Sequence, residues 1–353
     1  MGSTPDTKET GSAFVSVVLP VLNEERHIEA CLRSVLEQDY PPERYEVIVA
    51  DGGSTDRTRE IVAAVAARDP RVLLIDNPGR LQAAGLNRAI LASRGDVIAR
   101  QDGHAEWASD HLSRSVALLL RSGADNVGGR QEAVGDGASG RAIAAAMSSP
   151  FGVGGARFRY SDREEEMRTV FLGTFRRSAF ERVGLFDEAY PPHEDYELNE
   201  RIRSTGGRIL FSPWIRTRYH VRSGLRALGR QYFRYGRSKV RVARARPGVI
   251  RVYHLAPPAL VAALPLASVM AGTGRCRRLA LAGAGAYAAA CLIAAGRAGR
   301  GSTLDVRVRI PLTFAVMHLA WGAGFWAGVV EAVRGIETGG GSPPQLPGRS
   351  QTV

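Results

Sequence analysis

The sequence predicts an α/β fold with a Rossmann-like mixed sheet that carries helices on both faces, followed by apolar helices near the C-terminus. Short β-branched runs alternate with helical spacing along the N-terminal part, and three long apolar runs follow a basic stretch near the C-terminus. With 353 residues, the chain is long enough for one domain of about 200 to 250 residues and a further region.

The alternation of strands and helices begins after a polar N-terminal segment. Residues 15–20 form a β-branched run ended by proline, and residues 28–36 have apolar side chains at helical spacing. The pattern continues with a helix beginning near Arg57, a helix at 81–93, and strands at 45–50, 71–75 and 96–100. Parallel βαβ units bind ligands at the carboxyl ends of their strands, so we expect the chemistry in the loops after Pro20, Ala50 and Arg100.

The region that follows has a weaker pattern. Residues 131–168 are rich in glycine, alanine and serine without a clear period, and we expect a mobile connection that covers a ligand. After it the sequence predicts a strand at 170–176 and a turn at 184–187. A helix that opens with an acidic pair follows at 193–203, and a last strand at 208–211.

Charge is distributed unevenly along the chain. Residues 1–221 contain 28 basic and 32 acidic side chains, whereas residues 222–251 contain ten basic side chains and no acidic one. The basic surplus therefore lies beside the apolar runs and outside the first domain. This arrangement favours anionic lipid head groups or a diphosphate as partners and excludes nucleic acid, whose readers carry positive charge on the folded module.

The cysteines and the N-terminus indicate a cytoplasmic domain. Cys31, Cys276 and Cys291 show no paired spacing, which fits a reducing compartment and no thiolate metal site. Residues 1–13 are polar and lack the apolar core of a signal peptide.

Three apolar runs form the C-terminal region. Residues 310–333 are long enough to span a bilayer, whereas 255–271 and 279–295 are at the lower limit and the first of them contains prolines. We expect a two-helix hairpin and a spanning helix, and a shallow interfacial hairpin stays open. Arginines between the first two runs leave the orientation undecided by the positive-inside rule.

Five motifs occur in one order and spacing along the chain. They are Pro20-Val-Leu-Asn-Glu24, Asp51-Gly-Gly-Ser-Thr-Asp56, Asp102-Gly-His104, Glu194-Asp195 and Gln231-Tyr-Phe-Arg-Tyr235. In this respect the sequence resembles family 2 glycosyltransferases with the GT-A fold, and more narrowly the ExoA-type succinoglycan-biosynthesis branch. The resemblance covers roughly residues 15 to 260.

The resemblance divides the chain into five parts. We expect a GT-A catalytic domain at 14–221, a basic amphipathic juxtamembrane segment at 222–253 and a membrane region at 254–334. Disordered ends are expected at 1–13 and 335–353. The resemblance also implies a bacterial inner-membrane enzyme whose catalytic domain faces the cytoplasm.

A nucleotide-sugar donor needs hydrogen-bond acceptors for its base and ribose. Asp51, at the end of a predicted strand, can accept from a pyrimidine N–H or a ribose hydroxyl, although a turn and cap role is an alternative. The remaining donor-binding candidates are Pro20, Leu22, Glu24, Gly53, Arg80, Asn87 and Asp102. The family often has Ala-Arg-Asn where this chain has Gly85-Leu86-Asn87, so Arg80 or Arg88 is expected to replace that arginine.

A divalent cation is implied by the same family. Asp102 stands where the family places its Asp-x-Asp metal site, and a carboxylate there can hold Mn²⁺ or Mg²⁺ against the diphosphate. His104 replaces the second aspartate and suits Mn²⁺ better than Mg²⁺, unless it is only a loop residue. His220 is a further candidate ligand.

The catalytic base is expected in the acidic pair. In the resembling family the aspartate of this pair is the base, so Asp195, beside Glu194, is assigned to deprotonating the acceptor hydroxyl in an inverting transfer. The alternative is an acidic pair that caps a helix.

The acceptor implied by the resemblance is a polyprenyl-diphosphate-linked saccharide, and the donor is a UDP-sugar, with UDP-glucose expected. Gln231 and Arg234 are candidates for the acceptor or a diphosphate, with lipid head groups as the alternative partner of Arg234. Trp214 can stack on a sugar ring or pack in the core. Two other functions stay open: a processive polysaccharide synthase, and a catalytically inactive membrane scaffold that keeps the fold.

Overall fold

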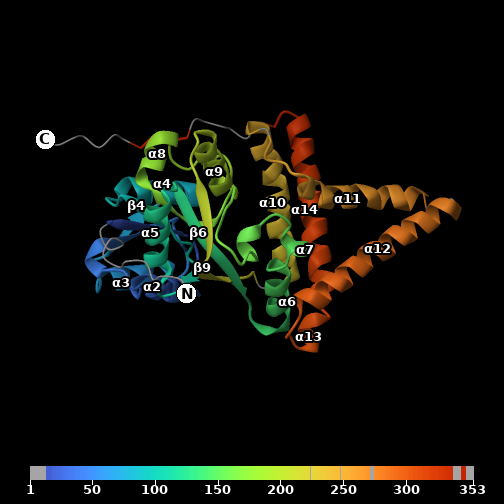
Figure 1. Cartoon of the computed structure of the whole chain (residues 1–353), viewed down its shortest axis with the longest axis horizontal. Coiled ribbons are helices and arrows are strands. Elements are labelled where there is room, and N and C mark those ends of the chain that lie inside the picture. Colours follow the sequence, from blue (N-terminus) through green and yellow to red (C-terminus); the bar gives the residue numbers. More distant parts are fainter. Residues whose placement is uncertain (1–12, 223, 247, 271–273, 337–342, 347–353) are drawn as a thin grey trace. The chain divides into compact units, whose positions relative to one another are not determined.

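The computed structural model describes residues 13–222, 224–246, 248–270, 274–336 and 343–346, with side chains of 264–276 excepted. The chain divides into two compact units, which we describe separately (Figure 1). The sheet unit comprises Met1–Glu132, Ser161–Tyr219 and Gly340–Val353, and the helical unit comprises Ala133–Tyr160 and His220–Gly339. The disorder predicted at the two ends falls almost entirely outside the described residues, as does the side chain of Cys276.

The parallel half of the sheet agrees with the predicted alternation. Its strands are β1 (Val15–Val21), β2 (Tyr45–Asp51), β3 (Val72–Asp76) and β4 (Val97–Arg100), and its helices are α2 (Ile28–Leu36), α3 (Thr58–Ala66) and α4 (Gln82–Ala92). β1 lies between β2 and β4, and β2 pairs with β3. The register puts Asp51 beside both Val21 and Asp76, so the carboxyl ends of these strands align.

Antiparallel strands complete a mixed sheet. They are β5 (Ala105–Trp107), β6 (Asn126–Val134), β7 (Glu165–Glu166), β8 (Phe171–Arg176) and β9 (Ile209–His220). The order is β3-β2-β1-β4-β8-β6-β9-β5, with β7 on β9. Three helices belong to this half, α5 (His111–Ser122), α8 (Arg177–Val183) and α9 (Glu194–Ser204), with a short 3₁₀ turn at η1 (Pro42–Arg44). The predicted strand at 208–211 was too short, because alternation of buried and exposed side chains continues to Tyr219.

The core of the sheet unit surrounds β1. Every residue of this strand is buried, which requires cover on both faces of the sheet. α4 packs on β1 and β2, while α2 packs on α3 and β5. Burial of the apolar face of α2, with Ile28 and Val35 fully enclosed, stabilises the fold by roughly 2 kcal/mol per side chain.

The irregular connection expected at 131–168 contains helices. It forms α6 (Gly137–Met147), α7 (Pro150–Val153) and η2 (Arg157–Arg159). α6 buries Ile143, Ala146 and Met147 and packs on helices of its own unit. Its apolar face consists largely of alanines, which hide the helical period that larger side chains would have made visible.

Four long helices make up the rest of the helical unit. They are α10 (Leu225–Ala245), α11 (Val252–Met270), α12 (Gly274–Ala298) and α14 (Ile310–Val333), with the short α13 (Leu304–Arg307) before α14. α10 and α14 lie side by side (Figure 1). Their backbones meet at glycines: a Cβ on Gly236 would lie 2.0 Å from the Trp321 carbonyl oxygen, and one on Gly324 would lie 2.0 Å from that of Phe233.

Two helices among the described residues are long and apolar enough to cross a membrane. They cover Arg277–Ala298 and Leu304–Val333, whereas the apolar stretch Val252–Ala263 of α11 is shorter. Several leucines of α12, such as Leu279 and Leu292, are exposed on its surface. The helices predicted from all three apolar runs are therefore present, and the basic segment before them forms α10.

Candidate active site

The loops after β1 and β2 are joined by hydrogen bonds between side chains and backbone. The Asn23 amide donates to Ser54 Oγ at 2.9 Å, and the Thr55 amide donates to Asn23 Oδ1 at 2.8 Å. Asn23 adopts φ 56°, a left-handed conformation that asparagine tolerates better than most residues. The Glu24 amide donates to Thr58 Oγ1 at 2.7 Å, so the motif starting at Pro20 and the motif starting at Asp51 form one connected surface.

Asp51 lies at the end of β2 with its carboxylate buried. Ser54 Oγ donates to Oδ1 at 2.6 Å, and Arg59 Nη1 lies 3.2 Å from Oδ2. Arg59 also pairs with Asp76 at 2.8 Å, at the end of β3. Asp51 therefore organises the turn, as the alternative interpretation of the sequence stated, and stands at the strand end where a nucleotide was expected.

The loop after β4 packs tightly against the loop after β1. A Cβ on Gly103 would lie 3.0 Å from Glu24 Cγ and 3.2 Å from Val21 Cγ1, so only glycine allows this approach without a shift. His104 Nδ1 lies 3.0 Å from Glu24 Oε1. The loop that begins at Asp102 therefore contacts Glu24 through His104 and Gly103, although these residues are about 80 positions apart in the sequence.

A buried arginine joins the Asp102 loop to the start of α9. Arg100 Nε lies 3.2 Å from Asp102 Oδ1, and Arg100 Nη2 lies 3.2 Å from Glu194 Oε1. The arginine and Glu194 are both buried, with side chains 8% and 2% exposed. Burial alone would lower the pKa of Arg100, but Asp102, Glu194 and Asp195 outweigh it and the pKa is raised. The guanidinium is therefore a permanent positive charge between three carboxyl groups.

The acidic pair at the start of α9 holds its protons unusually tightly. Burial raises the pKa of Glu194 to about 7, with Asp195 and Asp102 adding to the rise and Arg100 opposing it. Burial also raises the pKa of Asp195. Asp195 Oδ1 accepts from the Tyr196 amide at 2.6 Å within the first turn of α9, whose N-cap residue is His193. One guanidinium cannot neutralise three carboxyl groups, and the pair is consequently suited to take up a proton near neutral pH.

Asp102 has one oxygen held and one available. Arg100 and Gln82 both donate to Oδ1, the latter at 2.9 Å, whereas no hydrogen bond to Oδ2 occurs among the described residues. A carboxylate oriented through one oxygen fits a metal ligand that acts through the other. No three His, Cys, Asp or Glu side chains gather into a metal site in the described part of the chain. Asp102 can therefore supply only part of a coordination shell, which donor phosphates and water would complete.

The other predicted donor residues occupy the same edge or support it. Asn87 is buried in α4, where its side-chain amide donates to the Phe186 carbonyl oxygen and to the Glu188 carboxylate. It therefore holds the turn before α9 in place. Arg80 adopts φ 57° and is exposed in the loop before α4.

The remaining candidates are spread over the two units. Trp214 lies on β9 and is 63% exposed, so the expectation that it packs in the core is wrong. Gln231 and Arg234 lie on α10 of the helical unit. His220 is the last residue of β9 and belongs to the same unit. Gln231 is buried and donates to the Tyr235 hydroxyl at 2.9 Å.

Sequence reasoning missed Arg100 and Gln82 as parts of this site. A signal was present for Arg100: an arginine in an otherwise apolar strand, two residues before Asp102, is rarely buried without acidic partners. Gln82 gave no such signal, because its contact with Asp102 depends on how α4 lies against β1 and β4.

Comparisons with known proteins find a matching family model and similar proteins of known sequence. The family model described as glycosyl transferase family 2 matches residues 16–184. The succinoglycan biosynthesis protein ExoA of Rhizobium meliloti is 36% identical over 93% of this chain and 98% of its own length. A dolichyl N-acetyl-glucosaminyl phosphate diacetamido-dideoxy-glucuronosyltransferase of Methanococcus voltae is 27% identical over 64% of this chain and 73% of its own length.

A solved structure has the same fold. The mannosyltransferase PcManGT from Pyrobaculum calidifontis, in complex with GDP-Man and Mn²⁺, superposes with a TM-score of 0.66 at 23% identity. The match covers 92% of this chain and 89% of that one. The GT-A fold predicted from the motifs is thereby confirmed.

Proposed function

Because the chain belongs to glycosyltransferase family 2, we propose that it transfers a hexose from a UDP-sugar to a saccharide held on a polyprenyl diphosphate. The proposed donor is UDP-glucose, and the proposed product belongs to an exopolysaccharide or a cell-envelope glycan. One observation carries the proposal: Arg100 contacts both Asp102 and Glu194, so a donor-facing carboxylate and a proton-accepting pair share one buried cation.

The donor nucleotide is assigned to the connected loops after β1 and β2. Asp51 accepts from a uracil N–H or a ribose hydroxyl in this proposal, with Pro20, Leu22 and Glu24 forming the opposite wall. Gly53, at φ 75°, allows the backbone of the turn to approach the ligand without a side chain. Arg80, exposed on the same edge, is assigned to the nucleotide phosphates.

The transfer itself is assigned to the acidic pair. Asp195 takes the proton of the acceptor hydroxyl while that oxygen forms a bond to the anomeric carbon. The bond from this carbon to the diphosphate oxygen breaks, and UDP leaves with the bonding electrons. Attack from the face opposite the leaving group inverts the anomeric configuration. Burial raises the pKa of Asp195, which makes its carboxylate a stronger proton acceptor than an ordinary aspartate and supports its role as the base.

A divalent cation is proposed as the cofactor. When bound, Mn²⁺ or Mg²⁺ neutralises the charge that develops on the diphosphate. Asp102 would hold the ion through Oδ2, and the imidazole of His104 favours Mn²⁺. His220 stays a candidate for a further ligand.

The location that we propose is the cytoplasmic face of a bacterial inner membrane. The length and composition of the helices at Arg277–Ala298 and Leu304–Val333 support insertion into lipid. Basic side chains on α10 support contact with anionic lipid head groups.

The test is a transfer assay with membranes that contain the full chain. The membranes are incubated with a panel of radiolabelled nucleotide sugars, with Mn²⁺, Mg²⁺ or a chelator, and the lipid fraction is characterised. We expect label from UDP-glucose to enter the lipid fraction as one added residue. Addition of many residues would favour a processive synthase, and no label from any donor would contradict the proposal.

The metal assignment has its own variant. Asp102→Ala is expected to weaken metal-dependent UDP binding by roughly tenfold or more, measured by calorimetry with and without Mn²⁺. Glu106→Ala, on β5 in the same unit, serves as the control for loss of one acidic side chain. An unchanged metal requirement in Asp102→Ala would assign the ion to another site.

A further inference from the structure

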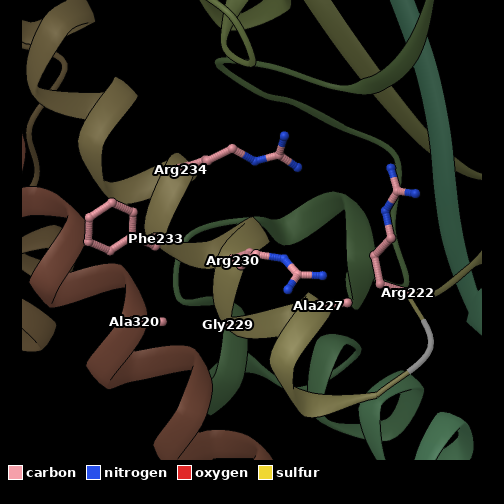
Figure 2. A pocket seen from close by; sticks show the side chains of 7 residues that line it. All are labelled: Arg222, Ala227, Gly229, Arg230, Phe233, Arg234 and Ala320. Carbon is pink, nitrogen blue, oxygen red and sulfur yellow. The ribbon is translucent and has the colours of Figure 1, made fainter. Parts of the chain in front are cut away.

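A cavity of about 830 Å³ opens along the first half of α10, within the helical unit. Figure 2 shows the guanidinium groups of Arg230 and Arg234 on α10, and of Arg222 on the segment before it, projecting into the same space. The remaining lining residues are Ala227, Gly229, Phe233 and Ala320. The cavity is therefore lined by three cations and by small or aromatic apolar groups.

The three arginines have no acidic partner among the described residues. Arg222, Arg230 and Arg234 form no ion pair with any described residue, whereas Arg237 and Arg241 of the same helix both pair with Glu331, at 2.6 and 3.2 Å. The described part of the helical unit has few acidic side chains, at Asp136, Asp305 and Glu331. Guanidinium groups that converge without a counter-ion repel one another, and an anion that binds between them removes this cost.

The number of arginines favours an anion with more than one charge. A lipid phosphodiester carries a single negative charge, whereas the diphosphate of a prenyl carrier carries about two. Three planar donors can contact two phosphate groups at once through paired hydrogen bonds. A diphosphate therefore matches the cavity better than a common lipid head group does.

The other wall of the cavity suits an apolar chain. Ala320 belongs to α14, which is one of the two helices long and apolar enough to cross a membrane. Phe233 is 37% exposed at the cavity although it is a large apolar side chain. Phe233 also lies at one of the two close approaches of α10 and α14, since its carbonyl oxygen faces Gly324. An amphiphile would meet cations at its head and this apolar surface along its tail.

We propose that the cavity lined by Arg222, Arg230 and Arg234 binds the diphosphate of a prenyl-linked acceptor, with the prenyl chain following Phe233 and α14. The inference rests on the proposed function for the chemical class of the acceptor, and it names the site that holds its carrier. Arg222 and Arg230 thereby join Arg234, which the sequence alone had selected.

The experiment measures binding without any sugar transfer. The full chain in detergent is titrated calorimetrically with farnesyl diphosphate, in the absence of nucleotide sugar. We expect Arg230→Gln and Arg222→Gln each to weaken binding by about tenfold, the effect of losing one charge-assisted contact. Both side chains are exposed, and equal melting temperatures would show that the variants fold.

Arg244→Gln is the matched control. Arg244 is exposed on the same helix, outside the cavity, and about 15 Å along the axis from Arg234. We expect its affinity for farnesyl diphosphate to stay within twofold of the wild type. Equal weakening in Arg244→Gln and Arg230→Gln would reduce the effect to general charge attraction and overturn the proposal.

Three further ligands distinguish the sources of phosphate. If inorganic pyrophosphate bound as tightly as farnesyl diphosphate, the apolar wall would contribute nothing to binding. Phosphatidylglycerol in mixed micelles with equal affinity would assign the cavity to ordinary lipid, and displacement of farnesyl diphosphate by UDP would assign it to the donor. Each of these results overturns the carrier assignment. None of them depends on turnover, so a failure of the proposed transfer reaction would be seen separately.

Discussion

Arginine has opposite surroundings in the two units of this molecule. In the sheet unit, Arg100 is buried and pairs with the carboxylates of Asp102 and Glu194. In the helical unit, Arg222, Arg230 and Arg234 line an open cavity and have no acidic partner among the described residues. The difference indicates that Arg100 positions other groups, whereas the α10 arginines are left available for a ligand.

The largest effect is expected from the base that Arg100 helps to hold. Asp195→Asn should lower turnover by about 10³-fold or more, because the acceptor hydroxyl loses its proton acceptor, while UDP affinity measured by calorimetry changes little. Asp187→Asn, in the turn before α9, is the control for a carboxyl lost nearby. Normal turnover in Asp195→Asn would remove this residue from the mechanism.

The next effect tests the positioning role of Arg100 itself. Arg100→Met should lower the free energy of unfolding by about 3 kcal/mol, because Asp102 and Glu194 lose their buried counter-charge. Arg244 is exposed and forms no ion pair with a described residue, so Arg244→Met should change stability by less than about 0.5 kcal/mol. Chemical denaturation of both variants in one detergent measures the difference, and similar values would mean that burial adds nothing to the Arg100 contacts.

A third effect concerns the close approach of α10 and α14. Gly324→Ala would place a Cβ 2.0 Å from the Phe233 carbonyl oxygen, so the helices must separate, at a cost of about 2 kcal/mol. Farnesyl diphosphate binding should weaken with it, and UDP binding should not. Gly283→Ala on α12, where a Cβ meets nothing within 4 Å, should alter neither. Unchanged farnesyl diphosphate affinity in Gly324→Ala would mean that binding in the cavity does not depend on the close packing of α10 and α14.

The last effect is a dependence of stability on pH. The folded pKa of Glu194 is raised from 4.5 to about 7, so the folded state binds its proton more tightly than the unfolded state. The resulting stabilisation is complete below about pH 4.5 and is lost progressively as the pH rises toward 7. Melting temperatures of the wild type and Glu194→Gln across this range measure it. The dependence should be flatter in the variant, and equal slopes would assign it to other groups.

Several parts of the site could be predicted from the sequence because they depend on local patterns. The strand ends at Asp51 and Asp102 and the acidic opening of α9 each follow from a short run of residues. Contacts between distant segments could not be predicted in this way. Gln82 bonds to Asp102, and Asn87 holds the turn at Phe186, only because α4 packs on β1 beside these loops.

Some expectations failed because a local pattern was ambiguous. The alanines of α6 conceal an apolar face that packing reveals, and the strand that contains Trp214 extends further than its apolar run. Residues 343–346 lie in the predicted disordered tail, yet the Leu185 amide donates to the Pro344 carbonyl at 2.8 Å. A proline- and glycine-rich composition does not reveal such a contact, because the partner is far away in the sequence.

The sequence by itself determined the alternation of strands and helices, the family motifs and the separation of charge, since each depends on residues that are close together in the sequence. The tertiary structure decided which charges are neutralised. Arg100 and Arg234 are the same chemical group, and only folding buries one among carboxylates and leaves the other facing a cavity. Electrostatic energy depends on distance and burial in space, which no order of residues along the chain specifies directly.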